Sequence, residues 1–160
     1  MLILNVGGTF NKIYNPLDGS LEVPYDNSAI ENILTSYMDE KNIAGAIYKD
    51  SLDMTMDDRK MLASIIHASN ETQFIVVHGT DTMKLSAEFL HEIFVDKTVV
   101  FTGAMRPYQI NNTESALNLG MAIGFMKANP PYGIYICMNG FIKPFNEIEK
   151  NRALGRFEVV

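Results

Sequence analysis

The stretch QFIVVHGTDT, residues 73–82, decides the fold class of this chain. Residues 73–78 form a short, largely apolar run that ends in a histidine, which is typical of a strand covered on both faces. The motif His78-Gly79-Thr80-Asp81-Thr82 ends this run, and its glycine and polar residues predict a turn. In an open α/β sheet, ligands bind at the carboxyl ends of the strands. The stretch therefore predicts that Thr80 and Asp81 face a ligand cleft.

A second motif of the same kind lies at residues 7–9. Residues 1–6 are largely apolar, and Gly7-Gly8-Thr9 follows them directly. Glycines permit positive φ angles, and a threonine hydroxyl can attack a carbonyl when a base removes its proton. Thr9 is therefore a candidate nucleophile, although a threonine at this point can also simply cap a turn. The Gly-x-Gly-x-x-Gly spacing of a dinucleotide site is missing, so no nicotinamide role is expected.

The rest of the chain alternates between strand-like and helical patterns. Three more apolar runs are predicted strands: 43–48, 98–102 and 133–138. Apolar residues at helical spacing predict four helices: 27–39, 55–68, 83–94 and 114–128. Thr55 and Asp58 resemble a capping box at the second of these helices. The alternation indicates a mostly parallel sheet between helical layers. The tail 139–160 has no clear apolar period and is predicted to be a loop with a short strand at 157–160.

Composition and charge narrow the class of protein. The 160 residues are 47% hydrophobic and 20% charged, which fits one globular domain. A net charge of −6 without a dense basic block disfavours a nucleic-acid partner. The single cysteine, Cys137, lies in an apolar run and is predicted to be a buried core thiol. Neither an intramolecular disulfide nor a zinc site built from cysteines is therefore expected.

The sequence carries no recognisable targeting signal. Residues 2–6 are too short for the apolar core of a signal peptide, and no apolar stretch reaches the length of a transmembrane helix. We therefore expect a cytoplasmic protein without a membrane partner.

Several polar residues near the predicted cleft have competing explanations. An unpaired Asp81 can hold a substrate ammonium or a catalytic lysine, but Asp81 or Thr82 also suits the N-cap of the helix expected near residue 83. His78 has no partner at metal-ligand spacing, so we favour a structural hydrogen-bonding role. Neither a cofactor nor a metal is expected. After the strand 98–102, the small Ala104 leaves a backbone carbonyl accessible to a substrate amide.

In combination, these segments resemble the N-terminal domain of the bacterial-type L-asparaginases, which are amidohydrolases. The matching segments are Gly7–Thr9, Asp50–Met54, Val77–Met83 and Thr102–Pro107, in that order. The resemblance covers nearly the whole chain. It implies a doubly wound α/β fold, a mostly parallel sheet with helices on both faces. It also implies hydrolysis of L-asparagine or a related side-chain amide to the acid and ammonia.

The resemblance assigns catalytic roles to the residues that match family motifs. Thr9 matches the primary nucleophile, and Thr80-Asp81 match two members of a second catalytic group. Lys150 falls where the third member, a lysine, is expected after the last strand. The family also places a tyrosine on the loop after the first threonine. We assign Tyr14 to this role, with Tyr25 as the alternative.

The resemblance also implies substrate contacts, and one of them is altered. Ser51 matches a serine that contacts the substrate carboxylate, and Ala104 offers its carbonyl to the substrate amide. Thr80 and Asp81 are expected to bind substrate as well. The next family position is usually a glutamine that binds substrate, but here it is Leu52, whose side chain cannot form a hydrogen bond. Leu52 therefore argues against free L-asparagine as the substrate.

Two function classes follow from these matches and departures. Family enzymes continue with a smaller C-terminal domain that completes a neighbouring subunit's site. We predict that residues 1–160 form one N-terminal-like domain without this second domain, assembled as a homodimer or higher homo-oligomer. The set Thr9, Thr80, Asp81 and Lys150 favours a threonine-nucleophile amidohydrolase. Leu52 and the missing domain favour the alternative, a non-catalytic protein that binds an amino acid or amide.

Overall fold

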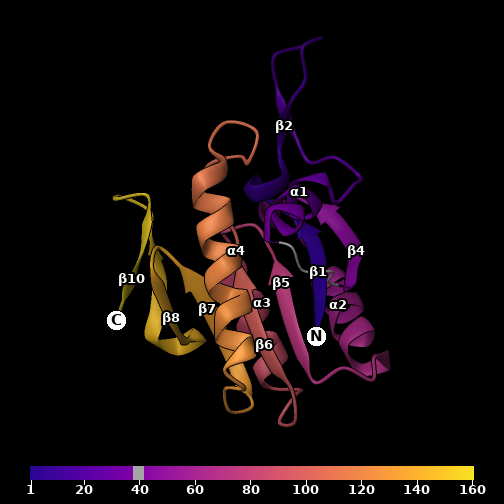
Figure 1. The fold of residues 1–160 in the computed structure, drawn as a ribbon, viewed down its shortest axis with the longest axis vertical. Coiled ribbons are helices and arrows are strands. Elements are labelled where there is room, and N and C mark those ends of the chain that lie inside the picture. The colour runs from indigo at the N-terminus through magenta and orange to yellow at the C-terminus, as the bar shows by residue number, and fades with distance from the viewer. Residues whose placement is uncertain (38–41) are drawn as a thin grey trace.

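A six-stranded sheet forms the centre of the molecule (Figure 1). The structure is a computed structural model that describes residues 1–37 and 42–160. Across the sheet, the strands are β4 (Asn42–Lys49), β1 (Leu2–Gly7), β5 (Gln73–Val77), β6 (Thr98–Thr102), β7 (Gly133–Met138) and β8 (Phe141–Pro144). The first five are parallel, and β8 runs antiparallel to β7. All five predicted strands are present, so the mostly parallel sheet is confirmed.

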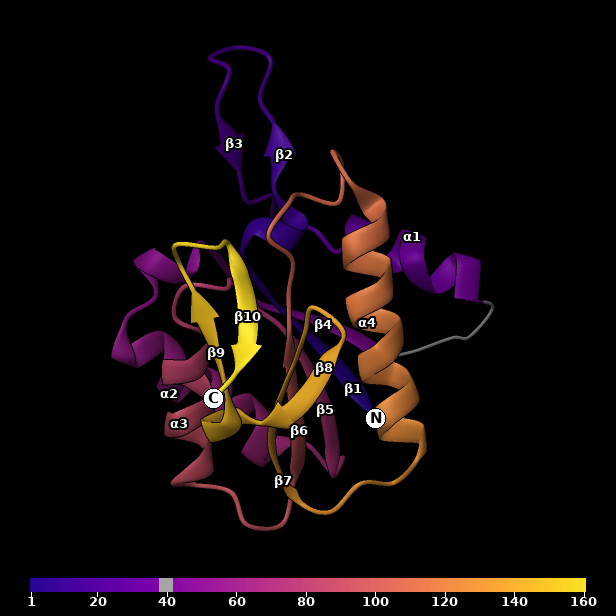
Figure 2. The ribbon, with the colours of Figure 1, turned by 90° about the vertical axis from the view of Figure 1, so that its left-hand side faces the viewer.

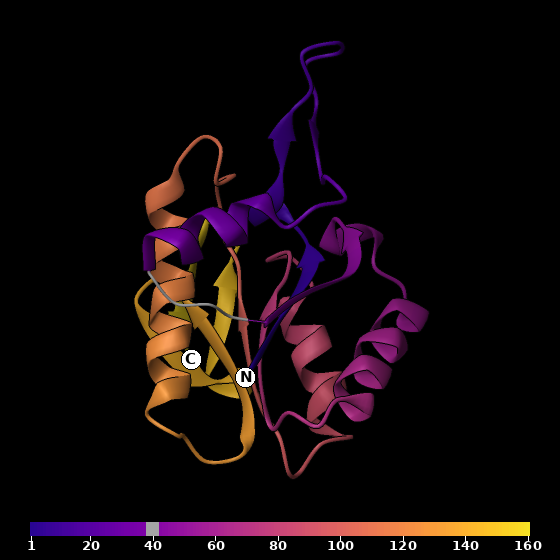
Figure 3. The same ribbon diagram turned by 45° about the vertical axis from the view of Figure 1, so that its right-hand side comes forward.

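Helices cover both faces of this sheet, which confirms the doubly wound α/β fold (Figure 3). One face is covered by α1 (Ser28–Tyr37) and α4 (Asn112–Lys127), the other by α2 (Met56–Ala68) and α3 (Met83–His91). Successive side chains of a strand point to opposite faces. In β1, Ile3 therefore packs with α1 and α4, while Leu4 packs with α2 and α3. This division explains why the strands are apolar throughout.

Helix boundaries differ from the predictions by a few residues. The predicted capping box of α2 is confirmed, because Thr55 and Asp58 each accept the other's backbone N–H through their side chains. Helix α4 begins at residue 112 rather than 114, and α3 ends at His91 rather than at residue 94. The last two residues of the predicted helix 27–39 lie outside the described residues. In the part of the chain that the structure describes, no helix is both long and apolar enough to cross a membrane.

The predicted side-chain cap of α3 is wrong. Thr82 occupies the N-cap position without forming a capping hydrogen bond. Its hydroxyl donates instead to the Ser51 carbonyl at 2.8 Å. The Asp81 carboxylate pairs with Lys150 and Arg152. Partners from distant segments have therefore replaced the local cap, and both side chains tie α3 to other parts of the chain.

The tail is more ordered than the predicted loop. It contains β8, a short 3-10 helix at Phe145–Glu147, and an antiparallel hairpin of β9 (Ile148–Asn151) and β10 (Arg156–Val159). The predicted terminal strand at 157–160 corresponds to β10, but β8 and β9 were missed. Strands of four residues contain too few apolar positions for a period to be recognised. Ile148 and Phe157 nevertheless anchor the hairpin in the core shared with α2 and α3.

The long loop after β1 also contains structure. A short 3-10 helix at Thr9–Asn11 is followed by a small hairpin of β2 (Ile13–Tyr14) and β3 (Leu21–Glu22). Figures 1 and 2 show this hairpin projecting away from the sheet beyond the carboxyl ends of the strands. The loop therefore places Thr9 at the sheet and Tyr14 in the projection.

Candidate active site

The strand order places a switch point between β1 and β5. From β1 the chain crosses to β4 on one side, and it then returns to form β5 on the other side of β1. Ligands of open α/β sheets bind in the crevice outside the carboxyl ends of the two strands at such a point. Thr9 follows β1 and Thr80 follows β5. Topology alone therefore directs both threonine motifs to one edge of the sheet.

A contact between two glycines holds the motifs together. Gly8 has a φ angle of +79°, and a Cβ atom built on it would lie 2.3 Å from both the Cα and the nitrogen of Gly79. Any side chain at this position would therefore collide with backbone. Each glycine is followed directly by one of the candidate threonines, the half-buried Thr9 and the buried Thr80. The close approach of the two loops thus depends on the absence of a Cβ atom.

Lys150 reaches this edge from the β9–β10 hairpin. Its Nζ donates to Thr80 Oγ1 at 2.8 Å and lies 3.0 Å from Asp81 Oδ1. The family resemblance had suggested that Lys150 belongs to the same catalytic group as Thr80, and the two side chains are within hydrogen-bond distance. The side chains of Lys150 and Asp81 are 15% and 23% exposed, so the ion pair is largely shielded from solvent.

The alternation of the hairpin explains how Lys150 points inward. Ile148 and Lys150 are two residues apart in β9 and share a face. Phe157, the cross-strand partner of Lys150, is 2% exposed and lies in the same core as Ile148. The buried face of the hairpin therefore carries Lys150 toward the beginning of α3. Figure 2 shows the hairpin lying beside α3.

Arg152 is a site residue that the sequence analysis missed. Its Nη1 lies 2.8 Å from Asp81 Oδ1, and its Nη2 donates to the Asp81 carbonyl at 3.4 Å. Asp81 therefore interacts with two cations through the same carboxylate oxygen. No sequence signal marked Arg152, because it lies in the turn directly after β9, where strand alternation does not fix the direction of a side chain.

Ser51 joins the loop after β4 to the motif after β5. Its side chain is buried, and its Oγ accepts the Asp81 backbone N–H at 3.2 Å. The neighbouring Asp50 carboxylate pairs with Lys12 at 2.5 Å and accepts the Leu52 backbone N–H. Ser51 thus lies next to Asp81, while its hydroxyl already takes part in holding that residue's backbone.

The pKa of the Asp50 carboxyl is held below its ordinary value by neighbouring groups. Burial alone would raise this pKa, but the hydrogen bonds from Lys12 and from the Leu52 backbone outweigh it. The positive charges of Lys12 and Lys150 act in the same direction. Asp50 is therefore an anion at neutral pH, and it interacts electrostatically with the candidate base.

His78 belongs to a buried network behind the site. Its Nδ1 lies 2.7 Å from the Gly79 carbonyl, and its Nε2 lies 2.9 Å from Ser86 Oγ. Arg59 Nε in turn donates to Ser86 Oγ at 3.1 Å. Burial lowers the pKa of His78 to about 4; the hydrogen bond to the Gly79 carbonyl opposes this shift, and the charge of Arg59 adds to it. The neutral imidazole therefore donates from Nδ1 and accepts at Nε2, which agrees with the predicted structural role.

The two candidate loop tyrosines occupy different surroundings. Tyr14 is 54% exposed on the projecting hairpin, and its backbone N–H donates to Gln109 Oε1 at 2.7 Å. Tyr25 lines a groove of about 570 Å³ together with Asp50 and Leu52. That groove therefore adjoins the segment that contains Ser51, and its wall includes the exposed Leu52 side chain.

The loop after β6 is held by side chains of α4. Asn118 donates to the Gly103 carbonyl at 2.9 Å, and Glu114 Oε1 accepts the Met105 N–H at 2.7 Å. Ala104 lies between these two anchors and is fully buried.

Cys137 is also buried, and burial raises its pKa to about 12 despite a hydrogen bond with Thr102 that lowers it. The prediction of a core thiol is therefore confirmed.

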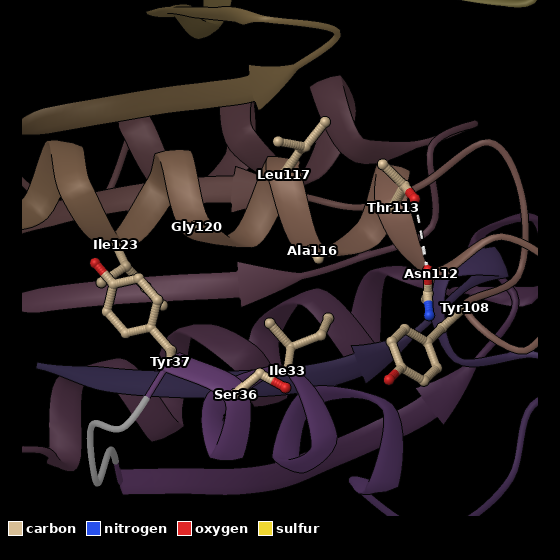
Figure 4. Close-up of a pocket in the computed structure, with 10 residues that line it drawn as sticks. All are labelled: Ile33, Ser36, Tyr37, Tyr108, Asn112, Thr113, Ala116, Leu117, Gly120 and Ile123. Atoms are coloured by element: carbon tan, nitrogen blue, oxygen red, sulfur yellow. Dashed lines mark hydrogen bonds between the residues drawn. The ribbon is translucent and has the colours of Figure 1, made fainter.

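A separate groove of about 430 Å³ lies between α1 and α4 (Figure 4). Its wall includes Tyr37, Tyr108, Leu117 and Gly120. None of the described residues that line it is a predicted site residue. Among residues 1–37 and 42–160, no group of three or more His, Cys, Asp and Glu side chains could hold a metal ion. The chemistry-bearing side chains are therefore concentrated at the edge formed by β1, β5 and the β9–β10 hairpin.

The fold and this edge define an α/β protein with a polar site at its topological switch point. The family model described as "Asparaginase, N-terminal" matches residues 1–157, and the chain belongs to that family.

Individual relatives agree with this membership. L-asparaginase 2 of Escherichia coli (strain K12) is 30% identical over 134 residues, which cover 78% of this chain and 38% of the relative. The probable periplasmic L-asparaginase of Haemophilus influenzae is 29% identical over 132 residues, which cover 76% of this chain and 38% of the relative.

A solved structure shares the fold over nearly the whole chain. The thermostable L-asparaginase from Thermococcus kodakarensis is 21% identical with a TM-score of 0.86, and the match covers 99% of this chain and 50% of that one. The chain therefore spans about half the length of this structure, and less than half of the two curated relatives.

Proposed function

We propose that the protein is an amidohydrolase that cleaves the side-chain amide of L-asparagine or a related compound, with Thr9 as nucleophile. The observation that carries this proposal is the 2.8 Å hydrogen bond between Lys150 and Thr80. A lysine held between a threonine and an aspartate is suited to moving a proton. The Gly8–Gly79 contact supports a common site for Thr9 and this group.

The proposed reaction has two covalent steps. Thr9 Oγ attacks the amide carbon, an ester bond forms, and the carbon–nitrogen bond breaks. The hydroxyl proton passes through Thr80 and Lys150 to the departing nitrogen, which leaves as ammonia. Water then attacks the ester, its hydroxyl group completes the acid, and its remaining proton returns to Thr9 Oγ. The net change is amide plus water to acid plus ammonia, so Lys150 and Thr80 end in their starting state.

Substrate contacts are proposed for the residues around this centre. Thr80 and Asp81 lie beside Lys150, and Ser51 adjoins Asp81 through the hydrogen bond to its backbone. Ala104 is assigned its carbonyl contact with the substrate amide by the resemblance alone; α4 holds its loop in place, and the residue is fully buried. For the loop tyrosine, the sequence analysis assigned Tyr14. The groove beside Asp50 and Leu52 supports the alternative, Tyr25.

The proposal extends to assembly and compartment. We propose a homodimer or higher homo-oligomer on the basis of the family resemblance. The cytoplasm remains a prediction from the sequence, and one relative is described as periplasmic.

The test is ammonia release from L-asparagine and from other side-chain amides by the wild type and two variants. Thr9→Ala removes the hydroxyl and is expected to lower the rate at least 100-fold, to the level of the buffer blank. Thr9→Ser keeps a hydroxyl and is expected to retain measurable turnover. Equal rates for the wild type and Thr9→Ala would refute Thr9 as nucleophile. Binding of these amides without ammonia release would favour the binding-protein alternative, which the exposed apolar Leu52 supports.

A further inference from the structure

The charge around Asp81 is unlike that of a site prepared for an ammonium group. Oδ1 of Asp81 lies 3.0 Å from Lys150 Nζ and 2.8 Å from Arg152 Nη1. Two cations against one carboxylate leave a local charge of +1 at this point. The neighbouring ion pairs add no net negative charge, because Lys12 pairs with Asp50 and Lys84 pairs with Glu149.

A substrate ammonium would meet this surplus of positive charge. A carboxylate attracts an ammonium most strongly when no other cation is bound to it. Because both cations contact Oδ1, an ammonium would have to bind at Oδ2 of the same carboxylate, close to both positive charges. A carboxylate on the ligand would instead find a guanidinium whose planar donors match its geometry. The Arg152 side chain is 65% exposed, so a ligand entering from solvent can reach it.

Leu52 is consistent with the same preference. Its exposed side chain lines the same groove as Asp50 and Tyr25, where it can contact the hydrocarbon part of a ligand but cannot accept a hydrogen bond from an ammonium.

We propose that Arg152 is a specificity-determining residue: by pairing with Asp81 beside Lys150, it makes the site prefer amides that carry a carboxylate and no free ammonium. This inference rests on the proposed amidohydrolase function and specifies its substrate class. The simplest member is succinamate, the monoamide of succinic acid, which has the carbon chain of L-asparagine without the α-ammonium. The wild type therefore hydrolyses succinamate with a higher kcat/KM than L-asparagine.

The test compares this ratio of kcat/KM values in the wild type, in Arg152→Gln and in the control Arg156→Gln. Arg156 is exposed on the same hairpin and pairs with Glu158 instead of Asp81. Arg152→Gln is expected to lower the succinamate-to-asparagine ratio of kcat/KM values about fivefold, which is the size of effect expected when one partly exposed charge is removed. Arg156→Gln is expected to keep the wild-type ratio. A ratio that Arg152→Gln leaves unchanged, or a wild type that prefers L-asparagine, overturns the inference.

A binding measurement separates this inference from the proposed reaction. Succinate and L-aspartate, the two products, are titrated into each protein and followed by calorimetry. Weaker binding of succinate to Arg152→Gln, with L-aspartate binding unchanged or improved, supports the inference even if no amide releases ammonia. If no amide releases ammonia but the binding result holds, only the proposed function is refuted, and the role of Arg152 stands. Binding of neither product to the wild type, or equal effects of Arg152→Gln on both, overturns the role of Arg152.

Discussion

Lowering the pH from 7 to 4 is expected to destabilise the protein through His78. In the unfolded chain, the imidazole takes up a proton near its ordinary pKa of 6.5. In the folded protein, burial lowers this pKa to about 4. Between these two values the unfolded state binds more protons than the native state, so the free energy of unfolding falls as the pH falls. The stabilisation is fully present above pH 6.5 and is lost progressively down to pH 4.

The size of this effect follows from the two pKa values. A difference of about 2.5 pKa units corresponds to about 3 kcal/mol in total, of which about 2 kcal/mol is lost between pH 7 and pH 5. The main physical cause is burial, which disfavours the charged imidazole, and the nearby charge of Arg59 adds to it. A protonated Nε2 would also lose the hydrogen bond that it accepts from Ser86 Oγ. Protonation thus places an unpaired charge in the core behind the site.

Urea-induced unfolding measured by circular dichroism at a series of pH values provides the assay. Carboxylates also titrate in this range, so the control is His78→Gln, which keeps a polar side chain but cannot take up the proton. The wild type is expected to lose about 2 kcal/mol more than His78→Gln between pH 7 and pH 5. Parallel losses in the two proteins would refute the assignment of a buried, neutral His78.

Two further predictions concern the base and the loop contact. Lys150→Met is expected to lower ammonia release by about 100-fold or more, with little change in Tm because Asp81 keeps a second cation. The control Lys84→Met removes an exposed ion pair with the same hairpin and should leave the rate of ammonia release unchanged. Undiminished turnover in Lys150→Met would exclude Lys150 from the mechanism. Gly8→Ala places a Cβ atom 2.3 Å from the backbone of the facing loop and should lower the free energy of unfolding by about 3 kcal/mol or more. Gly140→Ala has a similar φ of +85° but open space around it, so it should cost only about 1 kcal/mol. Equal costs in urea unfolding would contradict the steric argument.

The sequence predicted most of the strands well because β1, β5 and β6 are buried on both faces, while the edge strand β4 is only half-buried but still largely apolar. An apolar run such as 73–77 needs no periodicity to be recognised, and the turn motif marks its end. The hairpin that carries Lys150 was less predictable. Its strands are four residues long, and only Ile148 and Phe157 show that it belongs to the core. The resemblance located Lys150 by its position in the chain, without the strand that supports it.

Charge pairing at the site was the least predictable part. Asp81 was expected to bind a substrate ammonium, a lysine or the helix terminus, and local patterns could not choose among these partners. The structure pairs it with Lys150 and Arg152, which are sixty-nine and seventy-one residues away in the sequence. Arg152 had no motif of its own, because an arginine in a charged stretch is usually solvated. Its role depends on the hairpin geometry.

Continuous apolar runs and the glycine–threonine motifs at their ends determined, from the sequence alone, a mostly parallel sheet between helical layers with polar residues at one edge. Such patterns act over a few residues, so they identify each element and each strand end. The tertiary structure decided which strand ends meet, through the placement of β1 between β4 and β5. It also brought Gly8 against Gly79, and Lys150 with Arg152 against Asp81. These contacts join residues that are far apart in the sequence, so they depend on how distant segments pack together, which no local pattern encodes.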